Sequence, residues 1–172
     1  MQTVNPRSVE ARGIIGLADA YLNNRNHDER ATILQLLTLS MCGGLQGLLK
    51  CPDVVSRHWE YLIGTSRADM VLFHIDNSVS IIEAKGPKKT AVEAASGIGQ
   101  LLVYGATLPT AIGYVPTRLN LILAFPRLGN KDDEYALDVA CNTAGVVPLR
   151  LASPEQVFQF ADDEMAEIVT RG

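Results

Sequence analysis

Two short apolar runs separated by a polar turn constrain the fold of this chain more than any other part of its sequence. The runs are Ala68–Ile75 and Val79–Ile82, and Asp76-Asn77-Ser78 lies between them. Apolar runs of this length, bounded by turn residues, predict a β-hairpin. Side chains alternate between the two faces of a strand. Glu83 and Lys85, which follow the second run, are therefore expected on the same side of the sheet.

The register of this hairpin decides whether a second carboxylate joins Glu83. A three-residue loop would place Ile75 opposite Val79. In that register Asp69 lies opposite Lys85, on the face that also carries Glu83. A slip of one residue would turn Asp69 to the other face. We therefore predict this register, with the three charged groups on one face.

Two carboxylates and an ammonium at the end of a strand suit the chemistry of a divalent cation. Mg²⁺ binds carboxylate oxygens and keeps several water molecules. Asp69 and Glu83 can hold such an ion, which polarises a phosphate and lowers the pKa of a bound water. Lys85 can position that water or stabilise negative charge in the transition state. The alternative is a surface hairpin in which Glu83 and Lys85 form a solvated pair.

A helix is predicted over Thr90–Leu108, and Pro109 is expected to begin a loop that extends to Pro116. Gln100 and Tyr104 are four residues apart and therefore lie on one face of this helix. Glycines inside it weaken it by about 1 kcal/mol each, but they can allow close approach to the sheet. The expected buried side consists of Ala91, Ala94, Ala95, Ile98, Leu101 and Leu102, and the internal glycines are Gly97 and Gly99.

An acid on one strand, Glu-x-Lys on the next and Gln-x-x-x-Tyr on the following helix resemble the PD-(D/E)XK nuclease superfamily. The match spans about Arg67 to Tyr104, and its last element is similar to the RecB-type branch in particular. The resemblance implies a restriction-endonuclease-like fold. It also implies a Mg²⁺ ion, with Mn²⁺ as a substitute, bound by Asp69, Glu83 and the carbonyl of Ala84.

The resemblance also implies roles for the other residues of the pattern. Lys85 would serve the attacking water, and Gln100 and Tyr104 would contact DNA or support the site. In many superfamily members an acid of the first helix completes the metal site. Glu10 and Asp19 are the candidates here, with exposed helix charges as the alternative.

Three further cations near the proposed site are candidate nucleic-acid contacts. Arg67 stands at the start of the hairpin, and Lys88 and Lys89 follow its second strand. Contacts from such residues to phosphate position DNA without reading its sequence. The alternative is a surface arginine and a pair of loop lysines that keep the protein soluble.

The remaining chain alternates predicted helices and strands within one domain over residues 1–172. Helices are expected over 1–50, the core sheet with its helices over 57–151, and a last helix over 153–170. Leu119–Phe125 is almost continuously apolar and predicts a strand buried on both faces. Asp132 or Asp133 is expected to cap the helix that follows. The order predicts an α/β sandwich of three layers, with a central mixed sheet whose strand–helix–strand units pair in parallel.

Length and composition fit a globular protein, and the charge balance is mildly acidic. The 172 residues carry a formal net charge of −4. An acidic average counts against a tight, free-standing DNA binder, although the local field is what decides binding. Three widely spaced cysteines suit a reducing cytoplasm. Residues 1–12 lack the apolar core of a secretory signal, and no run is long enough to span a bilayer. We therefore expect a soluble cytoplasmic protein with no membrane partner.

Two classes of function follow from these observations. The first is a Mg²⁺-dependent deoxyribonuclease, a hydrolase that acts on DNA phosphodiester bonds, with a homodimer or a partner protein as the candidate assemblies. The second is a non-catalytic module on the same fold that binds nucleic acid or protein. An RNA nuclease would use the same site as the first.

Overall fold

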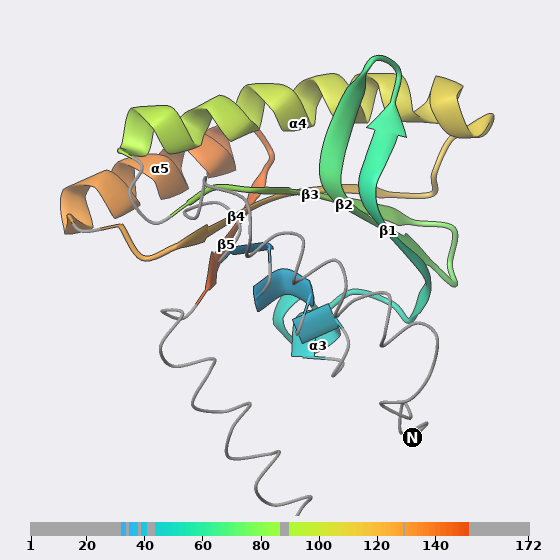
Figure 1. Cartoon of the computed structure of the whole chain (residues 1–172), viewed down its shortest axis with the longest axis horizontal. Coiled ribbons are helices and arrows are strands. Elements are labelled where there is room, and N and C mark those ends of the chain that lie inside the picture. The colour runs from blue at the N-terminus through green and yellow to red at the C-terminus, as the bar shows by residue number, and fades with distance from the viewer. Residues whose placement is uncertain are drawn as a thin grey trace, which may run out of the picture.

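One mixed β-sheet of five strands organises the fold (Figure 1). The computed structural model describes residues 32–33, 35–37, 39–40, 44–86, 90–128 and 130–151. Its strands are β1 (Val54–Ile63), β2 (Ser66–His74), β3 (Val79–Ala84), β4 (Leu119–Pro126) and β5 (Val147–Leu151). The helices with assigned bounds are α3 (Gly44–Leu49), α4 (Ala91–Ile112) and α5 (Lys131–Thr143). The described residues between 32 and 40 are also helical.

The sheet is antiparallel on one side of β3 and parallel on the other. β1 pairs with β2 and β2 with β3 in antiparallel fashion, whereas β3, β4 and β5 run parallel. α4 and α5 connect the parallel strands. The predicted α/β class, the mixed sheet and the parallel strand–helix–strand units are thus confirmed. The predicted helix over 153–170, and both Glu10 and Asp19, lie outside the described residues.

Helices cover both faces of the sheet, and β3 divides its residues between them (Figure 1). Val79 and Ile81 belong to an apolar cluster shared with residues of α4 and α5, on what we call the α4 face. Ile82 and Ala84 belong to a second cluster, shared with α3 and the helical residues before it, on what we call the α3 face. All six residues of β3 are buried. Any polar side chain on this strand therefore needs a partner inside the protein.

The turn between β2 and β3 closes one residue earlier than predicted. The N–H of His74 donates to the carbonyl of Ser78 at 3.0 Å, which encloses the three residues before Ser78. Asn77 has a φ of 60°, a left-handed conformation that asparagine tolerates better than most residues. The carboxylate of Asp76 accepts hydrogen bonds from the N–H and the hydroxyl of Ser78. These local contacts hold the loop at Ile75–Asn77 rather than at 76–78.

The register of the hairpin differs from the prediction for the same reason. Met70 pairs with Ile82, so continued pairing would set Asp69 opposite Glu83. The predicted pairing of Asp69 with Lys85 is wrong by two residues. Side chains on a strand return to the same face every two residues. A shift of two residues therefore leaves each side chain on the face that was predicted from alternation.

Near the middle of β1 and β2, the alternation of side chains between the two faces of the sheet is interrupted. On β2, Met70 belongs to the cluster on the α3 face and Ala68 to the cluster on the α4 face. Residues two apart on a regular strand would share a face. On β1, Glu60 has a φ of 50°, in the left-handed region. The hairpin therefore twists at this level, and Asp69 lies at the point of interruption.

α4 extends further than predicted. Thr90 caps it through a reciprocal pair of hydrogen bonds: the Thr90 hydroxyl accepts from the N–H of Glu93, and the Glu93 carboxylate accepts from the N–H of Thr90. The helix continues through Pro109 to Ile112, and Gly113 ends it with a φ of 78°. The predicted loop from Pro109 is therefore wrong. Only the last turn follows the proline, so one lost hydrogen bond does not end the helix. No helix in the described ranges has the length and hydropathy needed to cross a bilayer.

Two details of the helices depend on their neighbours and also differ from the prediction. Leu102 is 46% exposed, whereas Tyr104 is buried, so the buried side of α4 is rotated from the expected one. The sheet beneath the helix decides which residues it covers. On α5, the cap is Asn130 rather than Asp132 or Asp133, and its side chain accepts from the N–H of Asp132 at 2.9 Å.

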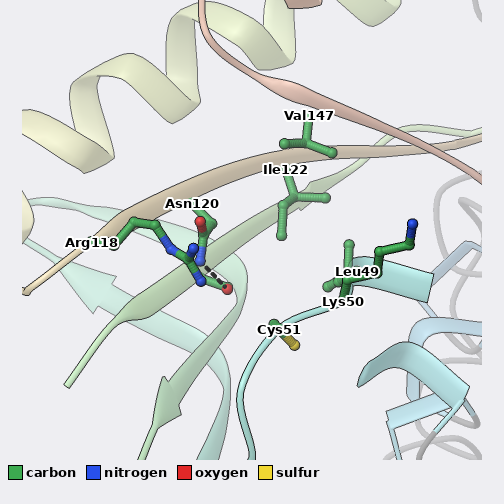
Figure 2. Close-up of a pocket in the computed structure, with 8 residues that line it drawn as sticks. Leu49, Lys50, Cys51, Arg118, Asn120, Ile122 and Val147 are labelled. Carbon is green, nitrogen blue, oxygen red and sulfur yellow. Dashed lines mark hydrogen bonds between the residues drawn. The ribbon is translucent and has the colours of Figure 1, made fainter. Parts of the chain in front are cut away.

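A neutral polar network lies on the α3 face, near the start of β3 and β4 (Figure 2). Nε2 of His74 lies 2.8 Å from Oγ of Ser80, which also accepts from Nδ2 of Asn120 at 3.2 Å. Nδ1 of His74 lies 3.0 Å from the carbonyl oxygen of Pro52. Because a carbonyl oxygen only accepts, Nδ1 carries a hydrogen; in a neutral ring, Nε2 then accepts from the Ser80 hydroxyl.

Candidate active site

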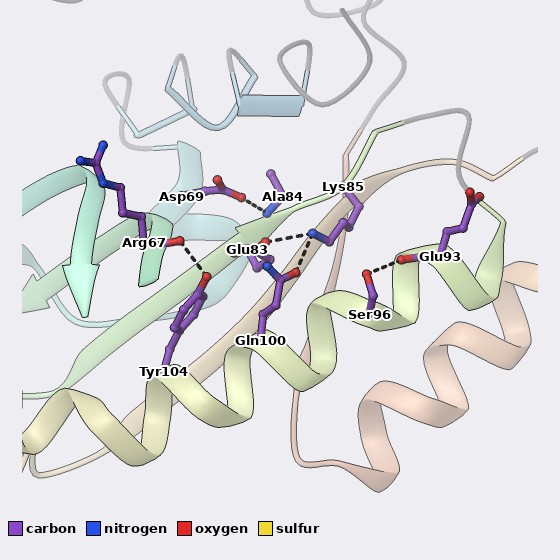
Figure 3. A network of polar contacts seen from close by, with 9 residues as sticks. All are labelled: Arg67, Asp69, Glu83, Ala84, Lys85, Glu93, Ser96, Gln100 and Tyr104. Atoms are coloured by element: carbon purple, nitrogen blue, oxygen red, sulfur yellow. Dashed lines mark hydrogen bonds and ion pairs between the residues drawn. The ribbon is translucent and has the colours of Figure 1, made fainter. Parts of the chain in front are cut away.

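The centre of the candidate site is the ammonium group of Lys85 (Figure 3). Its Nζ lies 2.9 Å from Oε1 of Glu83 and 2.9 Å from Oε1 of Gln100. Glu83 is 4% exposed and Lys85 7%. Alternation along β3 places both side chains on the α4 face, as predicted, and Gln100 comes from α4 itself. The alternative of a solvated surface pair is excluded, because the Glu83–Lys85 ion pair is buried.

A glycine on α4 makes room for this ion pair. A β-carbon added at Gly97 would lie 2.5 Å from Cδ1 of Leu123, 3.0 Å from Cε of Lys85 and 3.4 Å from Cγ of Glu83. Real β-carbons do not approach other atoms as closely as the first of these distances. Gly99 has no neighbouring atom within 4 Å of the same position. The expected close approach of α4 to the sheet is thus confirmed at Gly97 and not at Gly99.

Asp69 reaches the same region from β2. Its Oδ2 accepts a hydrogen bond from the backbone N–H of Ala84 at 2.7 Å. In a regular ladder that N–H would donate to a backbone carbonyl of β2. The carboxylate replaces this carbonyl where the two strands separate, directly after the Met70–Ile82 pair. Asp69 therefore lies against the backbone of the Glu-Ala-Lys segment, although the predicted register does not hold.

The hydroxyl of Tyr104 is affected by the negative charges of both Glu83 and Asp69. This hydroxyl donates to the carbonyl oxygen of Arg67 at 2.7 Å, which ties α4 to the start of β2. Burial raises the pKa of Tyr104 to about 12, with further contributions from the negative charges of Glu83 and then of Asp69. The two acids thus lie close enough to act on one hydroxyl group. Gln100 and Tyr104, predicted on one helix face, both contact this cluster.

Other predicted residues contribute less to the site. The guanidinium of Arg67 points away from the cluster, toward Glu60 at 3.9 Å, and both side chains are well exposed (Figure 3). The backbone of Arg67, by contrast, contacts the site, since its carbonyl accepts from the Tyr104 hydroxyl. Lys88 and Lys89 lie outside the described residues.

The donors gathered here fit a hard divalent cation. Within the described part of the chain, no group of three or more His, Cys, Asp or Glu residues lies together. Two carboxylates and a carbonyl suffice for Mg²⁺, however, because this ion keeps several of its waters. Asp69 accepts from the N–H of Ala84 and Glu83 from the ammonium of Lys85, and an ionised carboxylate has two oxygens with several lone pairs. The N–H of Ala84 points toward β2, where it donates to Asp69, and the carbonyl of Ala84 points toward the same strand.

The neutral network on the opposite face was not anticipated from the sequence. Ser80 interrupts the apolar run Val79–Ile82, and Asn120 interrupts Leu119–Phe125. A polar residue inside an apolar strand requires a buried partner, so these two interruptions were the signal available. Comparison of the chain with protein-family models and with curated proteins finds no match.

Proposed function

We propose that this chain is a metal-dependent nuclease that hydrolyses DNA phosphodiester bonds and has a restriction-endonuclease-like fold. The observation that carries the proposal is the convergence of Asp69, Glu83 and Lys85 from two adjacent strands. Gln100 of α4 completes the group by accepting from the Lys85 ammonium. These are four of the five residues in the sequence pattern that resembles the PD-(D/E)XK superfamily. The fifth is Tyr104, whose pKa is raised by the charges of Glu83 and Asp69 as well as by burial.

Asp69, Glu83 and the Ala84 carbonyl would hold the metal ion. A bound Mg²⁺ would polarise a phosphate oxygen and lower the pKa of a coordinated water. In the hydrolysis, a water oxygen forms a bond to phosphorus while the bond from phosphorus to the leaving oxygen breaks. The attacking water loses one proton and the leaving oxygen gains one.

The side chains of this chain supply charge and orientation. The ammonium of Lys85 stabilises the negative charge that develops on the phosphoryl oxygens. Glu83 and Gln100 fix the position of that ammonium, each at 2.9 Å. Tyr104 holds the strand that carries Asp69 by its hydrogen bond to the Arg67 carbonyl.

The burial of the ion pair supports a functional role over a purely structural one. Removing two charges from water costs several kcal/mol per ion, and the attraction between them often does no more than offset this cost. A pair of apolar side chains of similar size would serve stability at least as well. A buried Glu83–Lys85 pair is therefore more easily explained by chemistry at the site than by stability of the fold.

The proposal is tested by cleavage of plasmid and oligonucleotide DNA with Mg²⁺, with Mn²⁺ and with EDTA. The variants are Glu83→Gln, Lys85→Met and Asp69→Asn, with Lys131→Met and Asp132→Asn as controls on the exposed start of α5. Each site variant is expected to lose at least about 100-fold in rate. The control variants are expected to cleave like the unmodified protein.

Metal binding supplies a second readout that does not depend on turnover. Mn²⁺ titrations followed by electron paramagnetic resonance are expected to show about 10–100-fold weaker binding in Asp69→Asn. Cleavage that survives both Glu83→Gln and Lys85→Met would refute the assignment of the site. A folded protein that neither cleaves DNA or RNA nor binds Mn²⁺ would instead favour the non-catalytic binding module.

A further inference from the structure

A cavity lies on the α3 face, at the opposite end of β3 from Lys85 (Figure 2). Its volume is about 100 Å³. Residues from the starts of β3, β4 and β5 line it, together with the end of α3 and the residues that follow. We call it the α3-face cavity. None of the residues that line it belongs to the candidate active site.

One end of the cavity is polar and already organised. Asn120 donates one of its two amide hydrogens to Ser80, which also bonds to His74. His74 is in turn held by the carbonyl of Pro52. This chain of hydrogen bonds fixes the orientation of the Asn120 amide, which lies beside the guanidinium of Arg118 in the cavity wall (Figure 2).

The positive charge of Arg118 acts on the cavity. Burial raises the pKa of the Cys51 thiol, which also lines the cavity, and Arg118 opposes that rise. Among the described residues, no carboxylate lies within salt-bridge distance of Arg118. The carboxylate of Asp76 is near enough for its charge to interact with Arg118, but it forms no ion pair with it. The guanidinium is exposed at the edge of the cavity, where its planar group can bind a planar anion in a two-point contact.

The other end of the cavity is apolar. Leu49, Ile122 and Val147 form this wall; Figure 2 shows Leu49 across the cavity from Arg118, with Lys50 beside it, and Ile122 and Val147 along the side between them. An oxyanion such as phosphate makes no use of an apolar wall. A molecule with an anionic head and a hydrocarbon tail uses both ends.

We propose that the α3-face cavity binds a small organic carboxylate with a short aliphatic tail. The carboxylate would pair with Arg118 and accept from the Asn120 amide, while the tail would lie against Ile122 and Val147. The volume limits the size of the ligand: a cavity of about 150 Å³ takes a benzene ring, and this one has room for roughly three waters. Butanoate has as many heavy atoms as benzene, so its three-carbon tail would fill the cavity while its carboxylate stays at the edge beside the exposed Arg118. The proposal does not depend on the nuclease assignment.

The test is a titration of the full chain with butanoate, followed by amide and side-chain NMR signals. A ligand of about six heavy atoms is expected to bind with a dissociation constant in roughly the millimolar range. The side-chain amide of Asn120 and the backbone amide of Cys51 should shift. Arg118→Gln is expected to weaken binding by roughly tenfold or more. Arg127→Gln, at the other end of β4, is the matched control and should change it by less than about twofold.

Probes that lack either the charge or the aliphatic tail test separately the contact with Arg118 and the contact with the apolar wall. 1-Butanol should bind more weakly than butanoate because it lacks the charge, and acetate and inorganic phosphate should bind more weakly because they lack the tail. Val147→Phe, at a half-exposed position on the apolar wall, should block butanoate without depending on the charge. Alkylation of Cys51, followed by peptide mass spectrometry, should slow when butanoate is present, and alkylation of Cys141 should not.

Three results would overturn the proposal. Equal affinity for 1-butanol and butanoate would remove the role of Arg118. Phosphate or acetate binding as tightly as butanoate would remove the role of the apolar wall. Butanoate shifts that persist unchanged in both Arg118→Gln and Val147→Phe would place the ligand elsewhere. Each result leaves the nuclease assay unaffected, so failure here and failure of the proposed function are distinguishable.

Discussion

Ser80 and Glu83 are two buried polar residues that lie three residues apart on β3. Ser80 lies on the α3 face of the strand and Glu83 on the α4 face. Ser80 is held by neutral partners, His74 and Asn120. Glu83 is held by the ammonium of Lys85. A neutral network of satisfied hydrogen bonds is inexpensive to bury, whereas an ion pair loses much of its attraction to desolvation. The two faces thus differ in the free energy that it takes to bury their polar groups.

The faces also differ in packing around these groups. On the α4 face, Gly97 lets the helix close directly over Lys85 and Glu83. On the α3 face, the network around Ser80 borders a cavity of about 100 Å³. One face encloses its charge tightly, and the other leaves space beside its polar groups. The predictions below test this difference, in order of decreasing effect.

Breaking the ion pair should have the largest effect on stability. Lys85→Met leaves the carboxylate of Glu83 buried without its ammonium partner, and should lower the free energy of unfolding by about 3–5 kcal/mol. The double variant Glu83→Gln with Lys85→Met should recover most of this loss. Urea unfolding at neutral pH measures both. A single variant that costs less than the double variant would contradict the prediction.

Adding a methyl group over the ion pair should have the next largest effect. Gly97→Ala places a β-carbon against the buried Leu123 and against Lys85, and should destabilise the protein by about 1–3 kcal/mol. Gly99→Ala is the matched control two residues away on the same helix, with open space around the new methyl group. It should stabilise the helix by up to about 1 kcal/mol. Thermal and urea unfolding would show opposite signs for the two variants.

Removing the Ser80 hydroxyl should cost less than breaking the ion pair. Ser80→Ala leaves groups of His74 and Asn120 without their partner, at a cost of about 1–2 kcal/mol in unfolding free energy. Ser96→Ala, at an exposed hydroxyl on α4, is the control and should change stability by less than about 0.5 kcal/mol. A loss at Ser80 equal to that of Lys85→Met would remove the contrast between the faces.

Removing the Tyr104 hydroxyl should give the smallest effect and a distinct pH dependence. Tyr104→Phe loses the hydrogen bond to the Arg67 carbonyl, at about 1 kcal/mol. The folded protein raises the pKa of Tyr104 from 10.0 to about 12, so folding favours the protonated phenol. The stability from this group is complete below pH 10 and is lost as the pH rises through 12. The difference in unfolding free energy between the two proteins should therefore be constant near neutral pH and should shrink above pH 10.

The arrangement of elements was predictable because it depends on local sequence. Apolar runs and turn residues identified the strands of the hairpin, and apolar periodicity identified the helix that follows. The register was not predicted correctly. It depends on the turn, where Asn77 accepts a left-handed conformation and Asp76 binds Ser78. Several conformations of a three-residue loop fit the same sequence pattern, and only the contacts in the folded hairpin select one.

The sequence by itself determined that Glu83 and Lys85 share a face, because alternation along a strand requires it. It also determined that Gln100 and Tyr104 share a helix face. Only the tertiary structure decided where Asp69 lies, because β2 separates from β3 at that level and twists toward α4. The cavity beside Arg118 was likewise decided by the fold, since its walls come from segments far apart in the chain. Local periodicity fixes directions along one element, whereas the meeting of different elements depends on how their surfaces pack.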